Sequence, residues 1–218
     1  MLVGKNILAA AVFSFAISLA NIALAEGPAP QPPHLVMNQS SKISPILGHT
    51  TSEKNLIGYF GAINVKRQKV SLGEGETADG TVIYPNDSKR RASFVWKSTK
   101  KRDAPETIFV CDTPSLWRLP NEITTGTTLI ELEKMNGKPF KMSGFDWDCG
   151  GNVLSWNGGK LESALKSSSG KVSATLQLVP PASKHYPNEL IGDRVILSSN
   201  TNMRKLNPTV GTVNILNP

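Results

Sequence analysis

The segments TSEKNLIGYFGAINV (51–65) and TTLIELEKMNGKPFK (127–141) decide the fold that this sequence predicts. Aligned, they repeat a threonine, a leucine and a glycine at five-residue intervals. The threonine can cap a short helix by accepting a backbone N–H of its first turn, and the glycine stands where a helix would end. We therefore expect a short helix in each segment. The matched positions are Thr51 and Thr127, Leu56 and Leu132, and Gly61 and Gly137.

Strand-like runs follow each predicted helix. They are rich in apolar and β-branched residues and are bounded by turn residues, which favours antiparallel meanders. The sequence therefore predicts an α+β fold of two tandem repeats, each a short helix plus an antiparallel β-meander, over 43–112 and 113–218. The second repeat also carries C-terminal strands, and residues 200–208 between them are turn-rich. The predicted runs are 63–70, 81–85, 92–97 and 107–112, then 139–149, 152–157, 171–179, 194–199 and 209–216.

The first 25 residues have the order of a secretory signal peptide. Lys5 precedes an apolar run, and Ala23-Leu24-Ala25 supplies small residues at a cleavage site, so we expect cleavage after Ala25. The apolar run is too short to span a bilayer, and residues 26–42 form a proline-rich lead-in that we expect to be flexible. The sequence thus predicts an exported bacterial protein, periplasmic or secreted, with no membrane span after cleavage.

The net charge bears on the class of partner. The chain carries 24 basic and 17 acidic side chains, a formal net charge of +7. In a cytosolic protein this surplus would suggest nucleic acid, but export argues against it. We expect an envelope protein or an anionic envelope component as the partner, no nucleic acid and no cofactor; the oligomeric state stays open.

The two cysteines, Cys111 and Cys149, form an even pair. In an oxidising compartment such a pair predicts a disulfide. Two buried free thiols are the alternative.

The stretch GFDWDCGGNVLSWNGGK (144–160) begins like a calcium loop. Counted from Asp146, however, the fifth and twelfth positions are Gly150 and Asn157, which lack the required ligands. A hairpin explains the stretch better, with Gly150-Gly151 as its turn. Strand alternation would place Phe145, Trp147 and Cys149 on one face, and Asp146 and Asp148 on the other. No metal site is expected, since His34, His49 and His185 also lack ligand spacing.

The stretch SKRRASFVWKSTKKR (88–102) is the strongest candidate for a contact surface, with seven basic residues and no acid. Basic residues beside an aromatic strand can hold an anionic glycan or a lipid headgroup. The alternative is that they are solvated turn charges that protect strand ends. Trp117 and Tyr59 are predicted to lie in the core. The candidate binding residues are Arg90, Arg91, Trp96, Lys97, Asp146 and Asp148.

Two functions remain open on the sequence. The first is a non-enzymatic binding, assembly or inhibitor module of the cell envelope. The alternative is an envelope glycan hydrolase that uses Asp146 and Asp148, or a loop carboxylate such as Glu74 or Glu76. Carboxylates two residues apart on a strand lie roughly 6–7 Å from each other, which falls between the usual catalytic separations.

The pattern of a capping threonine, a helix ending in glycine and a β-meander resembles the repeats of BamE-type outer-membrane assembly proteins and of the β-lactamase inhibitor protein. The chain also resembles a family of exported bacterial proteins of unknown function. The segments that carry this resemblance are TTLIELEKMNGKPFKMSGFDWD, SWNGGKL, LGEGETADGTVIYP and SSNTNMRKLNP. The first resemblance implies a fold that presents a sheet to a protein partner. The second implies no activity and transfers no site residues.

Overall fold

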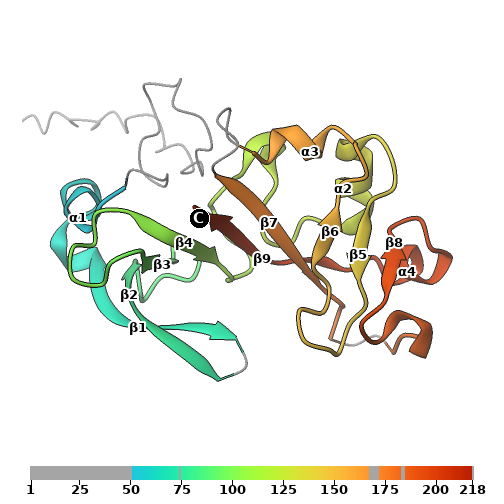
Figure 1. The fold of residues 1–218 in the computed structure, drawn as a ribbon, viewed down its shortest axis with the longest axis horizontal. Coiled ribbons are helices and arrows are strands. Elements are labelled where there is room, and N and C mark those ends of the chain that lie inside the picture. The colour runs from blue at the N-terminus through green and yellow to red at the C-terminus, as the bar shows by residue number, and fades with distance from the viewer. Residues whose placement is uncertain (1–50, 74, 167–171, 183–184, 218) are drawn as a thin grey trace, which may run out of the picture. The chain divides into compact units, whose positions relative to one another are not determined.

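The computed structural model describes residues 51–73, 75–166, 172–182 and 185–217, all within the compact unit Pro32–Pro218. The predicted signal peptide and lead-in, His34, His49 and Glu74 lie outside these residues. The described chain forms short helices and two antiparallel sheets (Figure 1), so the predicted α+β class is confirmed. Its first half contains α1 (Glu53–Phe60), β1 (Val65–Gly73), β2 (Glu76–Ile83), β3 (Ala92–Trp96), β4 (Pro105–Val110) and α2 (Leu129–Asn136). Its second half contains β5 (Lys141–Ser143), β6 (Val153–Ser155), α3 (Leu161–Ala164), β7 (Ser173–Val179), β8 (Val195–Leu197), α4 (Thr201–Leu206) and β9 (Thr209–Leu216).

The strands are divided between a six-stranded sheet, in the order β1-β2-β3-β4-β9-β7, and a three-stranded sheet, in the order β6-β5-β8. The first four strands form a meander, as predicted after the first helix. After α2 the chain alternates between the sheets, because β5, β6 and β8 build the small sheet while β7 and β9 extend the large one. The last strand, β9, lies between β4 and β7 and so joins the two halves of the large sheet.

Helices α1 and α2 begin in the same way. Ser52 caps α1 and Thr128 caps α2, and each hydroxyl accepts the backbone N–H three residues on. The side chains there, Asn55 and Glu131, accept a hydrogen bond from the cap residue's own N–H, which completes a capping box. Both helices are thus confirmed, but each cap lies one residue after the predicted threonine. Both helices end at the predicted glycines, Gly61 and Gly137.

A single apolar core lies against one face of the six-stranded sheet. The inward positions of its strands include Phe94, Ile108 and Val213, each at most 1% exposed, and the helices and the small sheet add side chains to the same cluster. Trp117 is 1% exposed and belongs to this core, as predicted. Tyr59 does not: it is 53% exposed, because the next residue, Phe60, occupies the inward position of α1.

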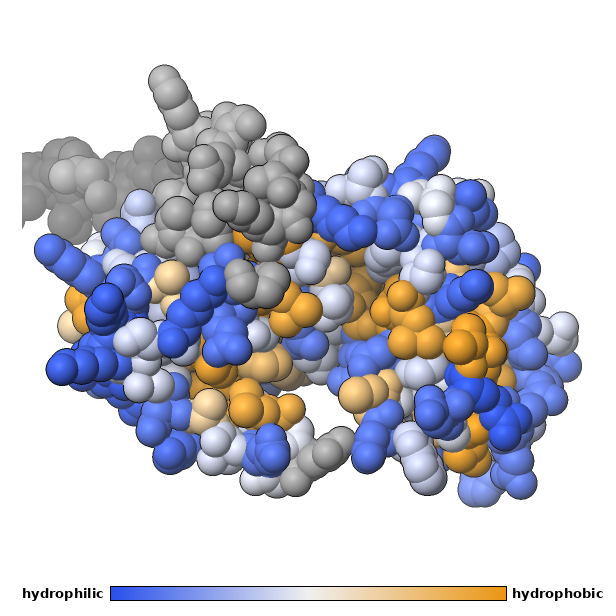
Figure 2. Space-filling view, viewed as in Figure 1, coloured by the Kyte–Doolittle hydropathy of each residue, from blue (hydrophilic) through white to orange (hydrophobic). Residues whose placement is uncertain are grey.

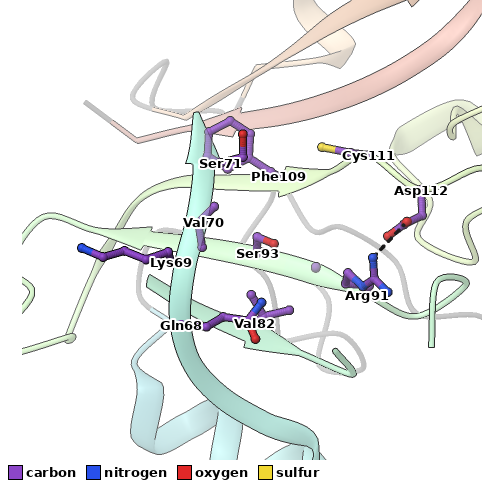
Figure 3. Close-up of a pocket in the computed structure, with 11 residues that line it drawn as sticks. Gln68, Lys69, Val70, Ser71, Val82, Arg91, Ser93, Phe109, Cys111 and Asp112 are labelled. Atoms are coloured by element: carbon purple, nitrogen blue, oxygen red, sulfur yellow. Dashed lines mark hydrogen bonds and ion pairs between the residues drawn. The ribbon is translucent and has the colours of Figure 1, made fainter. Parts of the chain in front are cut away.

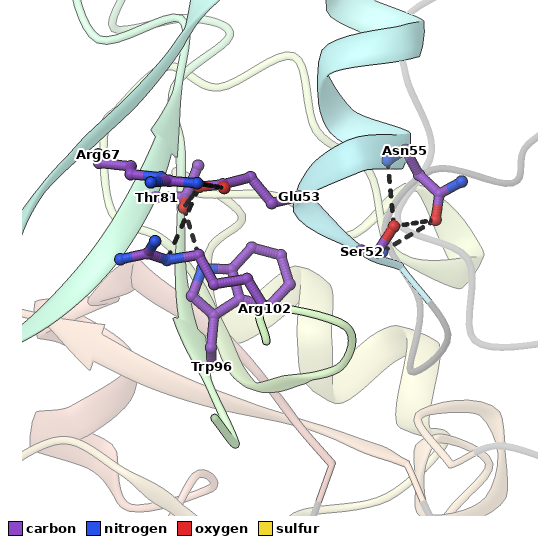
Figure 4. Close-up of polar contacts among 7 residues, drawn as sticks. All are labelled: Ser52, Glu53, Asn55, Arg67, Thr81, Trp96 and Arg102. Carbon is purple, nitrogen blue, oxygen red and sulfur yellow. Dashed lines mark hydrogen bonds and ion pairs between the residues drawn. The ribbon is translucent and has the colours of Figure 1, made fainter. Parts of the chain in front are cut away.

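A buried polar network fixes the start of α1 to the core face of the sheet (Figure 4). The Glu53 carboxylate accepts hydrogen bonds from Arg67 and from Thr81 Oγ1, the latter at 2.7 Å, and lies 3.8 Å from Arg102 Nε. Thr81 Oγ1 also accepts from Trp96 Nε1 at 2.9 Å. Burial by itself raises the pKa of Glu53, but the hydrogen bonds and the two guanidinium charges outweigh it and lower that pKa below its usual value.

The predicted Cys111–Cys149 disulfide is absent, since both cysteines are free and exposed. The order of the strands explains the separation. Cys111 directly follows β4, in register with Thr212 of β9, and Thr212 pairs with Gln177 of β7. Gln177 in turn pairs with Asn152, three residues after Cys149. Three interstrand steps therefore place Cys111 about 14 Å from Asn152, whereas a disulfide needs Cα atoms within about 7 Å.

The hairpin predicted in 144–160 exists, but its first strand is misplaced. Strand β5 ends at Ser143, before the quoted stretch, and pairs with β6. The nine residues between them, 144–152, form a loop in which Asp146 and Cys149 have positive φ. Phe145 is buried while Trp147 is 63% exposed, so the predicted alternation of faces is wrong. The turn predicted over 200–208 is also wrong in part, since Asn200 caps the helix α4 there.

Within the described ranges, no helix has the length and apolar character needed to cross a membrane.

Candidate functional site

The β1–β2 hairpin bends over the face of the six-stranded sheet that is turned away from the core. β2 pairs with β1 along its length but with β3 only over Gly80–Ile83, so the far part of the hairpin extends past β3. A Cβ atom at Gly80 would overlap Phe94 O and Val70 Cγ2, so only glycine permits this close crossing. Val70 is consequently 4% exposed, although it lies near the tip of the hairpin.

A groove of about 240 Å³ lies under this hairpin (Figure 3). Gln68 to Ser71 of β1 form one wall, and Ser93 of β3 and Phe109 beyond it on β4 form the floor. Ser93 and Phe109 pair across the two strands, so their side chains share the open face. Apolar Val70 and Phe109 and polar Ser93 therefore line the groove together.

The open face continues from the groove across β9 and β7. Phe109 pairs with Asn214 of β9, and Asn214 pairs with Thr175 of β7, so the three side chains form a row of half-buried groups. Asn214 Oδ1 is buried and has no hydrogen-bond partner in the part of the chain that the structure describes. A buried acceptor without a partner is uncommon in folded proteins, and this one lies beside the groove.

The charged groups of the groove are paired within the chain. Arg91 Nη1 lies 3.2 Å from Asp112 Oδ1, and Arg91 Nε donates to Pro85 O. Lys69 Nζ lies 2.9 Å from Asp79 Oδ1, with both side chains exposed. The groove therefore does not present a cluster of unpaired cations.

Cys111 lies at the end of the groove, beside Asp112 (Figure 3). Although the residue as a whole is exposed, burial of the thiol raises its pKa. The charge of Asp112 adds to this increase, and a hydrogen bond with Thr212 offsets part of it. A thiol with a raised pKa is a weak nucleophile at neutral pH, so the geometry favours contact with a ligand over covalent chemistry at this position.

Of the predicted basic residues, only Arg91 lines the groove. Arg90 forms a 2.6 Å ion pair with Asp87, and its guanidinium lies 4.2 Å above the centre of the Tyr84 ring. Lys97 is exposed just after β3. Trp96 is 2% exposed and offers no surface to a partner, because it belongs to the core face of β3.

The predicted acidic residues lie in the loop between β5 and β6, and both are exposed. Asp146 Oδ2 accepts a 2.7 Å hydrogen bond from Tyr186 Oη. Partial burial of the phenol and this interaction with Asp146 raise the pKa of Tyr186 to about 12. Because Asp146 has a positive φ of 58° and Asp148 does not, the parallel side-chain geometry expected of a strand is not found.

Two further predicted residues lie at the surface. Glu76 begins β2 at the exposed tip of the hairpin, and His185 is exposed in the loop after β7. Among the described residues, no three His, Cys, Asp or Glu side chains are grouped so that they could hold a metal ion.

The sequence reasoning missed Val70, Ser93 and Phe109 as lining residues. The glycine within the strand-like segment TADGTVIYP is the signal that could have indicated the bend.

Comparison of the chain with protein-family models, with curated proteins and with solved structures gave no match.

Proposed function

We propose that the protein is a non-enzymatic binding module of the bacterial cell envelope, periplasmic or secreted. Its binding site is the groove between β1 and the open face of the six-stranded sheet, and its partner is another envelope protein. The compartment rests on the predicted signal peptide of residues 1–25.

The size and lining of the groove carry this proposal. At about 240 Å³ it is smaller than the roughly 300–1,000 Å³ of ordinary small-molecule sites. It suits one or two side chains of a partner that inserts beneath β1. Val70 and Phe109 supply apolar contact, while Gln68, Ser71 and Ser93 supply polar contact.

The paired charges favour a protein segment over an anionic glycan or lipid. The Arg91–Asp112 and Lys69–Asp79 pairs leave no concentrated positive field at the groove. An anion would have to compete with these carboxylates, whereas a segment with apolar and amide groups would not. If the partner is instead an anionic envelope component, photocrosslinking will give a glycan or lipid adduct.

The resemblance to BamE-type and β-lactamase-inhibitor-type repeats supports an assembly or inhibitor role by analogy of fold alone.

The tandem repeat is part of the same proposal. The common capping box and terminal glycine of α1 and α2 support it, and the different strand order after α2 argues for later divergence. Separate expression of 43–112 and 113–218 tests it, since a folded half would give a cooperative melting transition.

Photocrosslinking in living cells tests the binding site. A photoreactive amino acid at Ser71, at the edge of the groove, should give one discrete protein adduct that mass spectrometry identifies. The matched control is Ser163, which is exposed on α3 and does not line the groove. The adduct should be weak or absent at this position.

A substitution that fills the groove provides a second test of the binding site. Ser93→Phe should remove the Ser71 adduct with little change in the melting temperature, because Ser93 faces the groove and not the core. Ser163→Phe, on α3, is the control. An adduct that survives Ser93→Phe would show that the groove is not the site, and a glycan or lipid adduct would show that the partner is not a protein.

A further inference from the structure

The outer edge of β8 differs from the other sheet edges that the structure describes. β1, the edge strand of the large sheet, carries Lys66, Arg67 and Lys69, and such charges discourage pairing with another strand. The edges of β6 and β7 face each other, since Asn152 pairs with Gln177. β8 has the sequence Val-Ile-Leu and its outer side pairs with no strand of the described chain.

The register shows which backbone groups of β8 point outward. Ser198 N donates to Phe140 O, and Gly144 N donates to Arg194 O, so residues 194, 196 and 198 face β5. Hydrogen-bonded and non-bonded pairs alternate along an antiparallel ladder. The N–H and C=O groups of Val195 and Leu197 therefore point away from β5. The carbonyl of Leu197 accepts Asn200 N, so three of these groups have no backbone partner among the described residues.

The outward side chains of β8 itself are apolar and exposed, and so is one on β6, at the other side of the small sheet. Val195 is 64% exposed and Leu197 is 44% exposed, and Leu154 of β6, on the same small sheet, is 53% exposed. Figure 2 shows hydrophobic residues gathered over this part of the molecule, where β5, β6 and β8 lie. A groove of about 570 Å³ runs along β8, lined by Glu189, Arg194, Val195, Ile196, Leu197, Ser199, Asn200 and Thr201.

From these observations we propose that β8 binds an extended peptide segment of a partner protein, which adds a fourth strand to the small sheet. Main-chain hydrogen bonds to Val195 and Leu197 would hold the segment, and alternate aliphatic side chains would pack on their exposed side chains. This site is separate from the groove under β1 and does not depend on it.

Two features decide the kind of occupant. A stable dimer buries about 1,200–2,000 Å², and a strand of three residues, about 10 Å long, supplies too little edge to support a second copy. Within the described residues the Arg194 guanidinium has one contact, a 3.5 Å hydrogen bond to Glu189 O. It can therefore pair with a carboxylate. The segment is short, alternately aliphatic, and carries an acidic residue next to Arg194.

Selection from a phage-displayed library of random eight-residue peptides tests the proposal. Peptides enriched on the purified protein should share alternate aliphatic residues and one carboxylate. In a synthetic copy of the best binder, single N-methylation should weaken binding about tenfold at alternate positions only, since one hydrogen bond is lost there. This period of two is specific to strand pairing, and a peptide held by side chains alone would not show it.

Substitutions in β8 provide a second test of peptide binding. Val195→Pro removes an N–H that β5 does not use, so the fold should survive while peptide binding weakens about tenfold or more. Val195→Lys should weaken it similarly by placing a charge at the edge. Leu154→Lys, which alters the same apolar surface away from the edge, is the control and should leave binding within about twofold.

Three outcomes overturn the proposal. The first is a selection that enriches no peptide. The second is an enriched peptide that binds Val195→Pro and Val195→Lys as tightly as it binds the unchanged protein. The third is a dimer in solution that Val195→Lys converts to monomers, which would identify a second copy as the occupant. Enriched peptides with the alternate N-methyl pattern and the loss at Val195 support it.

Discussion

The indole Nε1 of Trp96 donates a 2.9 Å hydrogen bond to Oγ1 of Thr81, and both side chains are buried. The same hydroxyl donates to Glu53 at 2.7 Å, so it connects a core aromatic on β3 to a carboxylate at the start of α1. This one side chain accepts the buried indole N–H and donates to a carboxylate that Arg67 also holds.

Thr81→Val should therefore destabilise the protein by about 1–3 kcal/mol, because the valine keeps the shape but leaves Trp96 Nε1 without an acceptor. Urea unfolding measures the change. Thr77→Val, on the exposed part of the same strand, should stay within about 0.5 kcal/mol. Equal effects at the two positions would contradict the role given to the buried hydroxyl.

The stability of the protein should fall in acid through Glu53. The pKa of Glu53 is lower in the folded protein than its usual value of 4.5, so the unfolded chain takes up the proton first as the pH decreases. The contribution of this carboxylate is complete above about pH 5 and is lost as the pH falls through the folded-state pKa. Thermal unfolding between pH 7 and pH 3 measures it.

Glu53→Gln provides the comparison for this pH dependence. The variant should be less stable at pH 7, by about 1–3 kcal/mol, and should lose less stability between pH 5 and pH 3. Glu106→Gln, at an exposed position on β4, should keep the original pH dependence. If Glu53→Gln has the same acid dependence as the unchanged protein, the network does not lower this pKa.

Gly151→Ala should be more harmful than Gly137→Ala. Both glycines have positive φ, 75° and 79°, and an alanine in the left-handed region costs about 1–2 kcal/mol. At Gly151 the added Cβ would also overlap the carbonyl oxygen of Leu178, whereas at Gly137 the nearest atom is 3.8 Å away. We expect about 3 kcal/mol or more at Gly151, measured by urea unfolding; a smaller loss there than at Gly137 would contradict this packing.

The protein should contain two free thiols. Its intact mass should not change on reduction, and alkylation should add two groups per molecule. Because burial raises the pKa of the Cys111 thiol, that thiol should react more slowly at pH 8 than in the unfolded chain. The Cys111→Ser variant assigns the slow phase. A native protein two hydrogens lighter than its reduced form would contain the disulfide that this structure lacks.

Several local features were predictable from the sequence. The ends of α1 and α2 at Gly61 and Gly137 were predicted, and so was the meander of β1 to β4. The caps were wrong by one residue, because threonine or serine at either of two adjacent positions satisfies the same local pattern. Ser52 and Thr128 are selected by the side chains three residues later, which complete the capping boxes.

Other errors have a common physical origin. Strand alternation was extended through Asp146 and Cys149, where the chain turns with positive φ. The short helix α4 has the composition of a turn, and its Asn200 cap was not recognised. In both places the local sequence permits two conformations, and packing against the rest of the chain selects one.

The sequence by itself determined the α+β class, the two capped helices and the β1–β4 meander, because these depend on contacts between residues close together in the chain. Only the tertiary structure decided the separation of Cys111 from Cys149, the groove under β1 and the outer edge of β8, which pairs with no described strand. All three follow from the order of strands within the sheets, above all from β9, which returns from the end of the chain to lie between β4 and β7. No local pattern specifies pairing over about a hundred residues of chain, because its free energy comes from the core that the strands build together.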